Sequence, residues 1–179
     1  MTFQIIPQRP EHAGLLEPLL DRTFGFDRRR KTVYRLREGV APVAALSFVA
    51  LAPDGGLLAS LRFWPISIGD GAAPAVLLGP LAVEPALQGI GIGRGLVRHG
   101  LAEAKRIGER ICVVVGDPSY YGPFGFGNAA IAGLILPGPV APERFQVLEL
   151  VLGALDGVSG LIHPAEEEET AQKRGDAVA

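Results

Sequence analysis

The stretch that decides the fold of this chain is Gln88-Gly89-Ile90-Gly91-Ile92-Gly93. The apolar run before it, at residues 76–83, has the length of a buried strand. The segment after it, at residues 94–108, places its apolar side chains on one face of a helix. Alternate glycines let a phosphate approach the backbone N–H groups, and the dipole of the following helix favours an anion. The sequence therefore predicts a site for a phosphorylated cofactor at this loop.

Two common phosphate-binding motifs do not fit the spacing of these glycines. A dinucleotide-binding G-x-G-x-x-G motif would need glycine at position 94 or 96, where the chain has Arg94 and Leu96. A P-loop would end in Gly-Lys, and the chain contains no Gly-Lys pair. A glycine-rich connection without a ligand is the plain alternative. The strand before the loop and the helix after it favour the binding site.

Two motifs carry a resemblance to a known family. Residues 88–93 read Gln-x-x-Gly-x-Gly after a strand and a proline, which resembles the acyl-CoA loop of the GNAT superfamily of N-acetyltransferases. Residues 121–126 are similar to the family's Tyr-x-x-x-Gly-Phe motif. The longer run GDPSYYGPFGF, at residues 116–126, is similar to a branch of mostly uncharacterised bacterial predicted acetyltransferases. The resemblance is specific over residues 76–126.

The resemblance implies an α+β fold with a central, mixed and mostly antiparallel sheet. This sheet is expected to splay between its fourth and fifth strands, with helices on both faces, in one domain at residues 1–164. The pair Gly79-Pro80 lies inside the fourth strand, where proline removes a ladder hydrogen bond and marks a bulge. The pantetheine arm of acetyl-CoA is expected to pair with the backbone of Leu81 and Val83. The implied cofactor-binding residues are Leu81, Ala82, Val83, Gln88, Gly89, Ile90, Gly91, Ile92, Gly93 and Arg94.

The implied activity is transfer of an acetyl group from acetyl-CoA to a primary amine of a small molecule or peptide. Direct attack in a ternary complex needs no covalent residue, and no Ser-His-Asp or Cys-His grouping is evident. By its position in the motif, Tyr121 is the candidate general acid for the departing thiolate, because a tyrosine of ordinary pKa is protonated at neutral pH. A packing role for Tyr121 is the alternative. A non-catalytic domain that binds or senses acyl-CoA is the rival function.

The general base is harder to assign. Glu84 and Asp117 each follow a strand expected to border the cleft, and Glu84 is the catalytic candidate. A solvated charge or a helix cap is the alternative for either carboxylate. Many family members have an asparagine seven residues before the motif tyrosine, where this chain has Val114. Asp117 and Ser119 are possible replacements for that contact to pantetheine.

Length and composition agree with a single soluble domain. The chain has 179 residues, a formal net charge of −2 and one cysteine, Cys112. This charge disfavours a nucleic-acid partner, and the lone cysteine suits a reducing compartment, so we expect a cytoplasmic protein. The three histidines have no metal-binding spacing, so no metal is expected. Neither a signal peptide nor a membrane-spanning stretch is evident, and a homodimer is left open.

Local patterns predict the remaining elements. Strands are expected at residues 2–6, 43–52, 57–68, 75–83, 111–115, 128–136 and 145–152, and helices at residues 10–24, 28–38 and 94–108, with a short helix starting at Pro118. The basic residues at 28–31 are expected to be the solvated face of a helix, with attraction of an anionic acceptor or of the cofactor's 3′-phosphate as the alternative. Residues 165–179, which are acidic and polar, are predicted to be disordered.

Overall fold

The computed structural model describes residues 2–165, and the chain divides into two compact units. Unit 1 comprises Met1–Lys31, Pro42–Phe63 and Leu78–Gly108, and unit 2 comprises Thr32–Ala41, Trp64–Leu77 and Glu109–Ala179. The strands are β1 (Gln4–Pro7), β2 (Ser47–Leu51), β3 (Leu57–Ile68), β4 (Ala73–Val83), β5 (Ile111–Val115), β6 (Gly127–Asn128), β7 (Leu134–Ile135), β8 (Phe145–Glu149) and β9 (Gly160–Pro164). The helices are α1 (Ala13–Phe24), α2 (Ile92–Arg106) and α3 (Pro118–Tyr121).

The strands follow the order β1-β2-β3-β4-β5-β8-β6, and β9 pairs with both β3 and β7. The pairs β1–β2, β2–β3, β3–β9, β5–β8 and β6–β8 are antiparallel, whereas β7 and β9 are parallel. Helix α2 connects β4 to its neighbour β5, which is the crossover that a parallel pair requires. The mixed, mostly antiparallel α+β arrangement expected from the sequence is confirmed.

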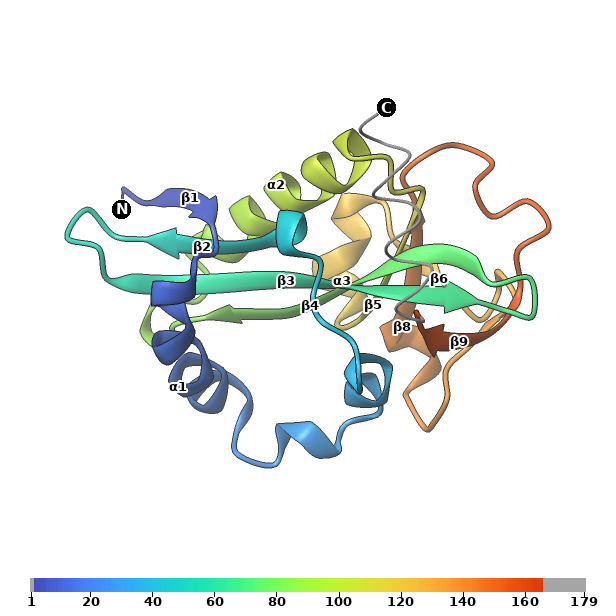
Figure 1. Ribbon diagram of the computed structural model, residues 1–179, viewed down its shortest axis with the longest axis horizontal. Helices are drawn as coiled ribbons and strands as arrows, with labels where there is room; N and C mark the ends of the chain where they lie inside the picture. Colours follow the sequence, from blue (N-terminus) through green and yellow to red (C-terminus); the bar gives the residue numbers. More distant parts are fainter. Residues whose placement is uncertain (1, 166–179) are drawn as a thin grey trace. The chain divides into compact units, whose positions relative to one another are not determined.

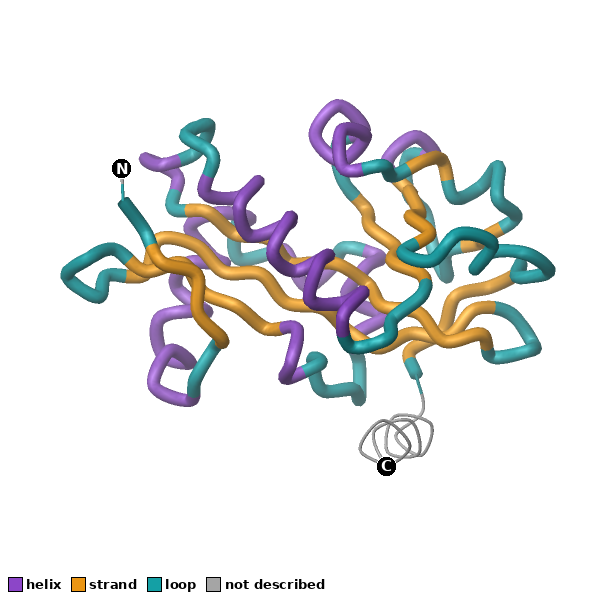
Figure 2. Tube along the Cα trace, turned by 90° about the horizontal axis from the view of Figure 1, so that it is seen from above, coloured by secondary structure: helices purple, strands orange, loops and turns teal. Residues whose placement is uncertain are grey.

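Unit 1 packs a helix on each face of its strands (Figure 1). On one face, Leu19 and Leu20 of α1 form a small core with Ala82 of β4. On the other face, α2 runs over the strands (Figure 2) and approaches them closely at Gly100. A Cβ atom at Gly100 would lie 2.6 Å from the ring of Phe63, which is fully buried. The glycine therefore sets how near the helix that follows the cofactor loop comes to the sheet.

Unit 2 has its own apolar core. This core includes Ile66 from β3, Leu77 from β4, Val113 from β5, Val147 from β8 and Ile162 from β9. The apolar run at residues 111–115 forms β5 over the length expected, and its cysteine, Cys112, is completely buried. Because Cys112 packs within a central strand, its role in the structure is that of a small apolar residue.

The helix predicted for residues 28–38 is wrong. Two 3-10 turns, η2 (Arg28–Arg30) and η3 (Thr32–Arg37), are separated by Lys31, whose backbone is extended. Arg28 is drawn against α1 by ion pairs with Glu17 and Asp21. Arg35 of η3 donates instead to the carbonyl oxygen of Pro137, at 2.7 Å. These tertiary contacts outweigh the helix propensity of the segment, which is rich in arginine.

The single strand predicted for residues 128–136 is also wrong, because an Asx turn divides it into β6 and β7. The side-chain oxygen of Asn128 accepts hydrogen bonds from the N–H groups of Ala130 and Ile131, at 3.0 and 3.2 Å. Strand β9 was not predicted. It ends at Pro164, and the N–H of Ala165 donates to the carbonyl oxygen of Pro65. The predicted disordered tail lies, from residue 166 onward, outside the described residues.

Candidate functional site

At the end of β4, the backbone groups of two residues point away from β3. The N–H of Glu84 donates to the carbonyl oxygen of Leu58 on β3, at 2.8 Å. Because the backbone groups of a strand alternate in direction, those of Leu81 and Val83 point to the opposite side. These are the two positions at which pairing with pantetheine was expected. Upstream, Gly79 has a φ of +124°, so the backbone departs from regular strand geometry at the expected pair.

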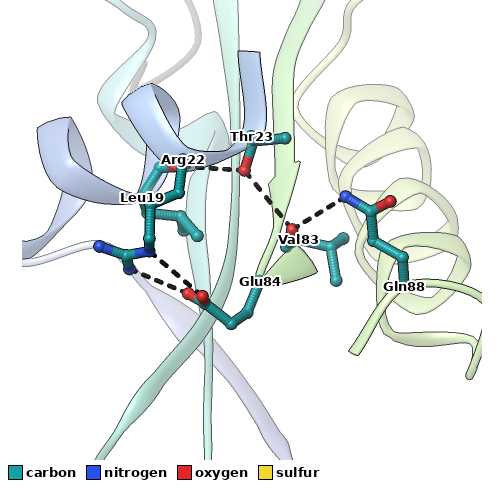
Figure 3. Close-up of polar contacts among 6 residues, drawn as sticks. All are labelled: Leu19, Arg22, Thr23, Val83, Glu84 and Gln88. Atoms are coloured by element: carbon teal, nitrogen blue, oxygen red, sulfur yellow. Dashed lines mark hydrogen bonds and ion pairs between the residues drawn. The ribbon is translucent and has the colours of Figure 1, made fainter. Parts of the chain in front are cut away.

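The carbonyl oxygen of Val83 already has side-chain donors (Figure 3). The amide nitrogen of Gln88 lies 3.3 Å from it, and the hydroxyl of Thr23 on α1 lies 3.4 Å from it. The same hydroxyl also donates to the carbonyl oxygen of Leu19, at 2.8 Å. A ligand that paired with Val83 would therefore find its carbonyl oxygen already bonded to side chains. The side chain of Gln88 stabilises the turn that leads into the loop.

The loop itself has the backbone geometry that an anion site needs. Gly89 and Gly91 have φ angles of +84° and +98°, and a Cβ atom at either position would meet nothing within 4 Å. The space in front of both glycines is therefore open. Gly91 caps α2, and its carbonyl oxygen accepts the N–H of Gly95 at 3.0 Å. The N–H groups of Ile92 and Gly93 precede this first helical bond, so the helix offers them no partner of its own.

Charge at the start of α2 also favours an anion. The first turn of the helix has no acidic residue, and it contains Arg94, whose side chain is exposed. A cation near a helix N-terminus opposes the helix dipole. This arrangement becomes favourable when a phosphate lies there, because the phosphate interacts well with both the arginine and the helix end.

The remaining loop residues contribute through the backbone or through packing. The side chains of Ala82 and Ile92 are fully buried in unit 1, so only their backbone groups could contact a cofactor. Ile90 is 53% exposed and lies between the two glycines of positive φ. The structure thus brings Leu81–Val83 and Gln88–Arg94 together in one strand–loop–helix junction.

Glu84 stands at the start of this junction and is paired. Its two carboxylate oxygens accept hydrogen bonds from Nε and Nη2 of Arg22, at 3.1 and 2.9 Å. The hydrogen bonding of Arg22 to the Glu84 carboxylate raises the pKa of Arg22 above its ordinary value. The base role of Glu84 stays a prediction, and the structure shows that an amine proton would compete with this arginine. Sequence reasoning did not identify Arg22 or Thr23.

In unit 2, the other candidate, Tyr121, is held in an aromatic cluster after β5. Its ring contacts Tyr120 and Phe126 edge to face, with centroids 4.9 and 5.8 Å apart, and Phe124 is nearby at 6.4 Å. Tyr121 is only 9% exposed, and this burial raises its pKa above the ordinary value. The hydroxyl therefore remains protonated at neutral pH. It is suited to donate a proton rather than to accept one.

The residues around Tyr121 explain the GDPSYYGPFGF motif physically. Asp117 caps α3, and its Oδ1 accepts from the hydroxyl and from the N–H of Ser119, both at 2.8 Å; these two bonds lower the pKa of the Asp117 carboxyl. Pro118 occupies the first turn, as expected. Gly116 leaves room for the ring of Tyr121, because a Cβ atom there would overlap the tyrosine's Cε2. The carbonyl oxygen of Gly116 accepts from the buried side chain of Gln146, at 3.1 Å. This geometry fits the alternative role of Asp117 as a helix cap rather than a general base.

The contact between Gly116 and Tyr121 leads to a prediction. We expect Gly116→Ala to displace the tyrosine ring and to destabilise the protein by about 1–3 kcal/mol, as overpacking does in other cores. Thermal unfolding of the purified variant measures the loss. Gly122→Ala is the matched control, since a Cβ atom there meets nothing within 4 Å and the backbone is helical. Equal melting temperatures for the two variants would contradict the prediction.

The basic cluster at residues 28–31 does not form one helix face, and of its four residues Arg28 alone is buried, whereas Arg29, Arg30 and Lys31 are exposed. Arg28 is buried and paired with Glu17 and Asp21, and Lys31 lies over the ring of Phe24 at 5.5 Å. Within residues 2–165, no three histidine, cysteine or acidic side chains are grouped to hold a metal ion. Helices in this part of the chain are all too short or too polar to cross a bilayer.

Comparison with known proteins agrees with the geometry of the site. The acetyltransferase (GNAT) family profile matches residues 15–119. Among curated proteins, the uncharacterized N-acetyltransferase YhbS of Escherichia coli (strain K12) is 35% identical over 86% of this chain and 90% of its own length. The uncharacterized N-acetyltransferase YjhQ of the same strain is 32% identical over 80% of this chain and 79% of its own length.

Two solved structures are similar in fold and sequence. The crystal structure of YhbS from E. coli in complex with CoA has a TM-score of 0.79 and 33% identity, and covers 93% of this chain and 92% of its own. A GNAT family acetyltransferase from Brucella melitensis in complex with acetyl-CoA has a TM-score of 0.67 and 30% identity, and covers 92% of this chain and 96% of its own. On these matches in sequence and fold, this chain is a member of the GNAT family of acetyltransferases.

Proposed function

We propose that this protein transfers an acetyl group from acetyl-CoA to a primary amine of a small molecule or peptide. The observation that carries the proposal is the open, glycine-rich start of α2. There, Gly89 and Gly91 leave space for a pyrophosphate, and the N–H groups of Ile92 and Gly93 point out of the helix end. The relatives crystallised with CoA and acetyl-CoA support the same choice of cofactor.

The chemistry requires a neutral amine, a polarised thioester and a proton for the leaving sulfur. The amine nitrogen attacks the thioester carbonyl carbon directly, the carbon–sulfur bond breaks, and the sulfur leaves as a thiolate. Tyr121 supplies the proton to this thiolate as the general acid. The hydroxyl holds a proton to donate at neutral pH, although burial raises its pKa and so makes it a weaker acid than a free tyrosine. The proton lost by the amine passes to water or to a nearby base.

Binding by the strand, loop and helix uses mainly backbone groups. We expect pantetheine to pair with the N–H of Val83, because the Val83 carbonyl oxygen already accepts from Thr23 and Gln88. Arg94 adds positive charge near the phosphates. The cytoplasmic location and the homodimer considered from the sequence stay predictions.

The experiment is a screen of amines with acetyl-CoA. Small polyamines, amino-sugar antibiotics and peptides with free N-termini are incubated with the protein and acetyl-CoA, and release of the CoA thiol is followed. We expect at least one class of amine to give turnover above the rate of thioester hydrolysis. Binding of acetyl-CoA without turnover across a broad panel would favour the rival function, a domain that binds acyl-CoA without catalysis.

A further inference from the structure

The last turn of α1 contacts the segment that opens the cofactor loop (Figure 3). Arg22 pairs with Glu84, and the hydroxyl of Thr23 reaches the carbonyl oxygen of Val83. Arg22 and Glu84 are 62 positions apart in the chain. From the side of the loop, Gln88 donates to the same carbonyl oxygen. Val83 and Glu84 are consecutive residues of the junction. They are contacted from α1 by Arg22 and Thr23, and Val83 is also contacted from the loop by Gln88.

The pair between Arg22 and Glu84 has the geometry of a fork. Nε faces one carboxylate oxygen at 3.1 Å and Nη2 faces the other at 2.9 Å. The side chain of Arg22 is 51% exposed and that of Glu84 is 28% exposed. An ion pair this exposed contributes little to global stability. Two parallel hydrogen bonds nevertheless define the orientation of both groups, which a single contact does not.

The position of Glu84 makes its orientation matter. Its N–H is bonded to Leu58 on β3, and its carbonyl oxygen accepts the N–H of Leu87 at 2.8 Å. Glu84 therefore begins the turn η5 (Pro85–Leu87), which leads to Gln88 and Gly89. A change of backbone direction at Glu84 would move the loop amides that follow. Binding groups tolerate displacements of only about 0.5 Å before affinity suffers.

We propose that Arg22 and Glu84 form a brace that positions the cofactor loop, with Thr23 and Gln88 as supporting contacts. The brace connects α1 to the binding of acetyl-CoA, and it rests on the proposed function in that the loop binds this cofactor. Glu84 is then a positioning residue, and its carboxylate serves Arg22 rather than the amine proton. The brace and the base role of Glu84 predict different effects of the same substitutions on affinity and turnover.

The test compares Arg22→Gln, Glu84→Gln and the double variant. We expect each single variant to bind acetyl-CoA about three- to tenfold more weakly in calorimetry, the range of modest coupling between contacts outside a site and the site itself. The double variant should bind no more weakly than the singles, because the two residues act through one interaction. Melting temperatures should stay close to that of the unmodified protein, since the pair is exposed.

A matched control lies in the same unit. Arg106 and Glu103 form an ion pair at 2.8 Å near the C-terminal end of α2, and Glu103 is 28% exposed, as Glu84 is. Glu103→Gln removes an equivalent charge away from the loop, and we expect it to leave acetyl-CoA affinity unchanged. Once an accepted amine is known, KM for acetyl-CoA should rise in both brace variants while kcat is retained.

The outcomes separate three ideas. If the unmodified protein does not bind acetyl-CoA, the proposed function fails before the brace is examined. If it binds and the Arg22 and Glu84 variants bind equally well, the brace is overturned. If Glu84→Gln lowers kcat sharply with unchanged affinity while Arg22→Gln does not, the base role replaces the brace.

Discussion

Tyr121→Phe is expected to lower turnover about a hundred- to ten-thousand-fold, the usual contribution of a general acid. Phenylalanine keeps the aromatic ring over Gly116 and beside Phe126, so the packing of the cluster is retained. Only the proton for the leaving thiolate is lost. Acetyl-CoA affinity should change little, because the loop and strand backbone of unit 1 are expected to carry it. Initial rates with an accepted amine, together with calorimetry, measure both quantities.

Two comparisons make this result interpretable. Tyr120→Phe removes a hydroxyl from the adjacent position on α3. We expect it to lower turnover less than Tyr121→Phe does, and its loss measures the effect of removing any tyrosine hydroxyl from this cluster. Tyr121→Leu removes the ring, so it should lower the melting temperature as Tyr121→Phe does not. Turnover of Tyr121→Phe within about threefold of the unmodified rate would sink the assignment. A joint loss of melting temperature and affinity would instead assign Tyr121 to packing.

Gly91→Val is expected to weaken acetyl-CoA binding by at least about a hundredfold, the order of a few lost charge-assisted hydrogen bonds. Gly91 has a φ of +98°, which a β-branched residue rarely adopts. A side chain at this position would also fill the open space in front of the loop. The variant therefore disturbs both the backbone conformation and the room for the pyrophosphate. Calorimetry with acetyl-CoA gives the change in affinity.

The other end of the same helix supplies the control. Gly108 has a φ of +94°, and a Cβ atom there also meets nothing within 4 Å. Gly108→Val should therefore carry a similar backbone strain without touching the loop. We expect the two variants to have comparable melting temperatures, and only Gly91→Val to lose affinity. Equal acetyl-CoA affinity in the two variants would remove the loop from the cofactor site.

Local sequence signals predicted the elements that depend on local physics. The strand patterns at residues 57–68 and 111–115 placed β3 and β5 at the observed bounds. The glycines of the loop predicted an open approach to the backbone, and the structure has open space in front of Gly89 and Gly91. In each case the deciding interaction lies within a few residues of the signal, so the sequence alone carries enough information.

Elements decided by distant contacts were missed. Helical spacing at residues 28–38 was outweighed by the ion pairs of Arg28 with α1, which no local pattern reveals. The pairing of Glu84 with Arg22 could not be predicted for the same reason, since Arg22 lies on α1, far from Glu84 in the chain. Asn128 could have been recognised, because an asparagine followed by small residues and Gly133 is a turn signal. The sequence therefore indicated the loop but not the residues of α1 that contact the segment before it.

Cys112, the single thiol of the chain, is completely buried in β5. Its reactivity therefore reports when β5 becomes exposed to solvent. A disulfide reagent that measures released CoA should not react with the folded protein, so the assay background stays low. When β5 separates from its neighbours, one thiol per molecule becomes reactive. The rate of labelling without substrate therefore measures the free energy of that opening. The same reagent can thus compare catalysis and local stability in every variant.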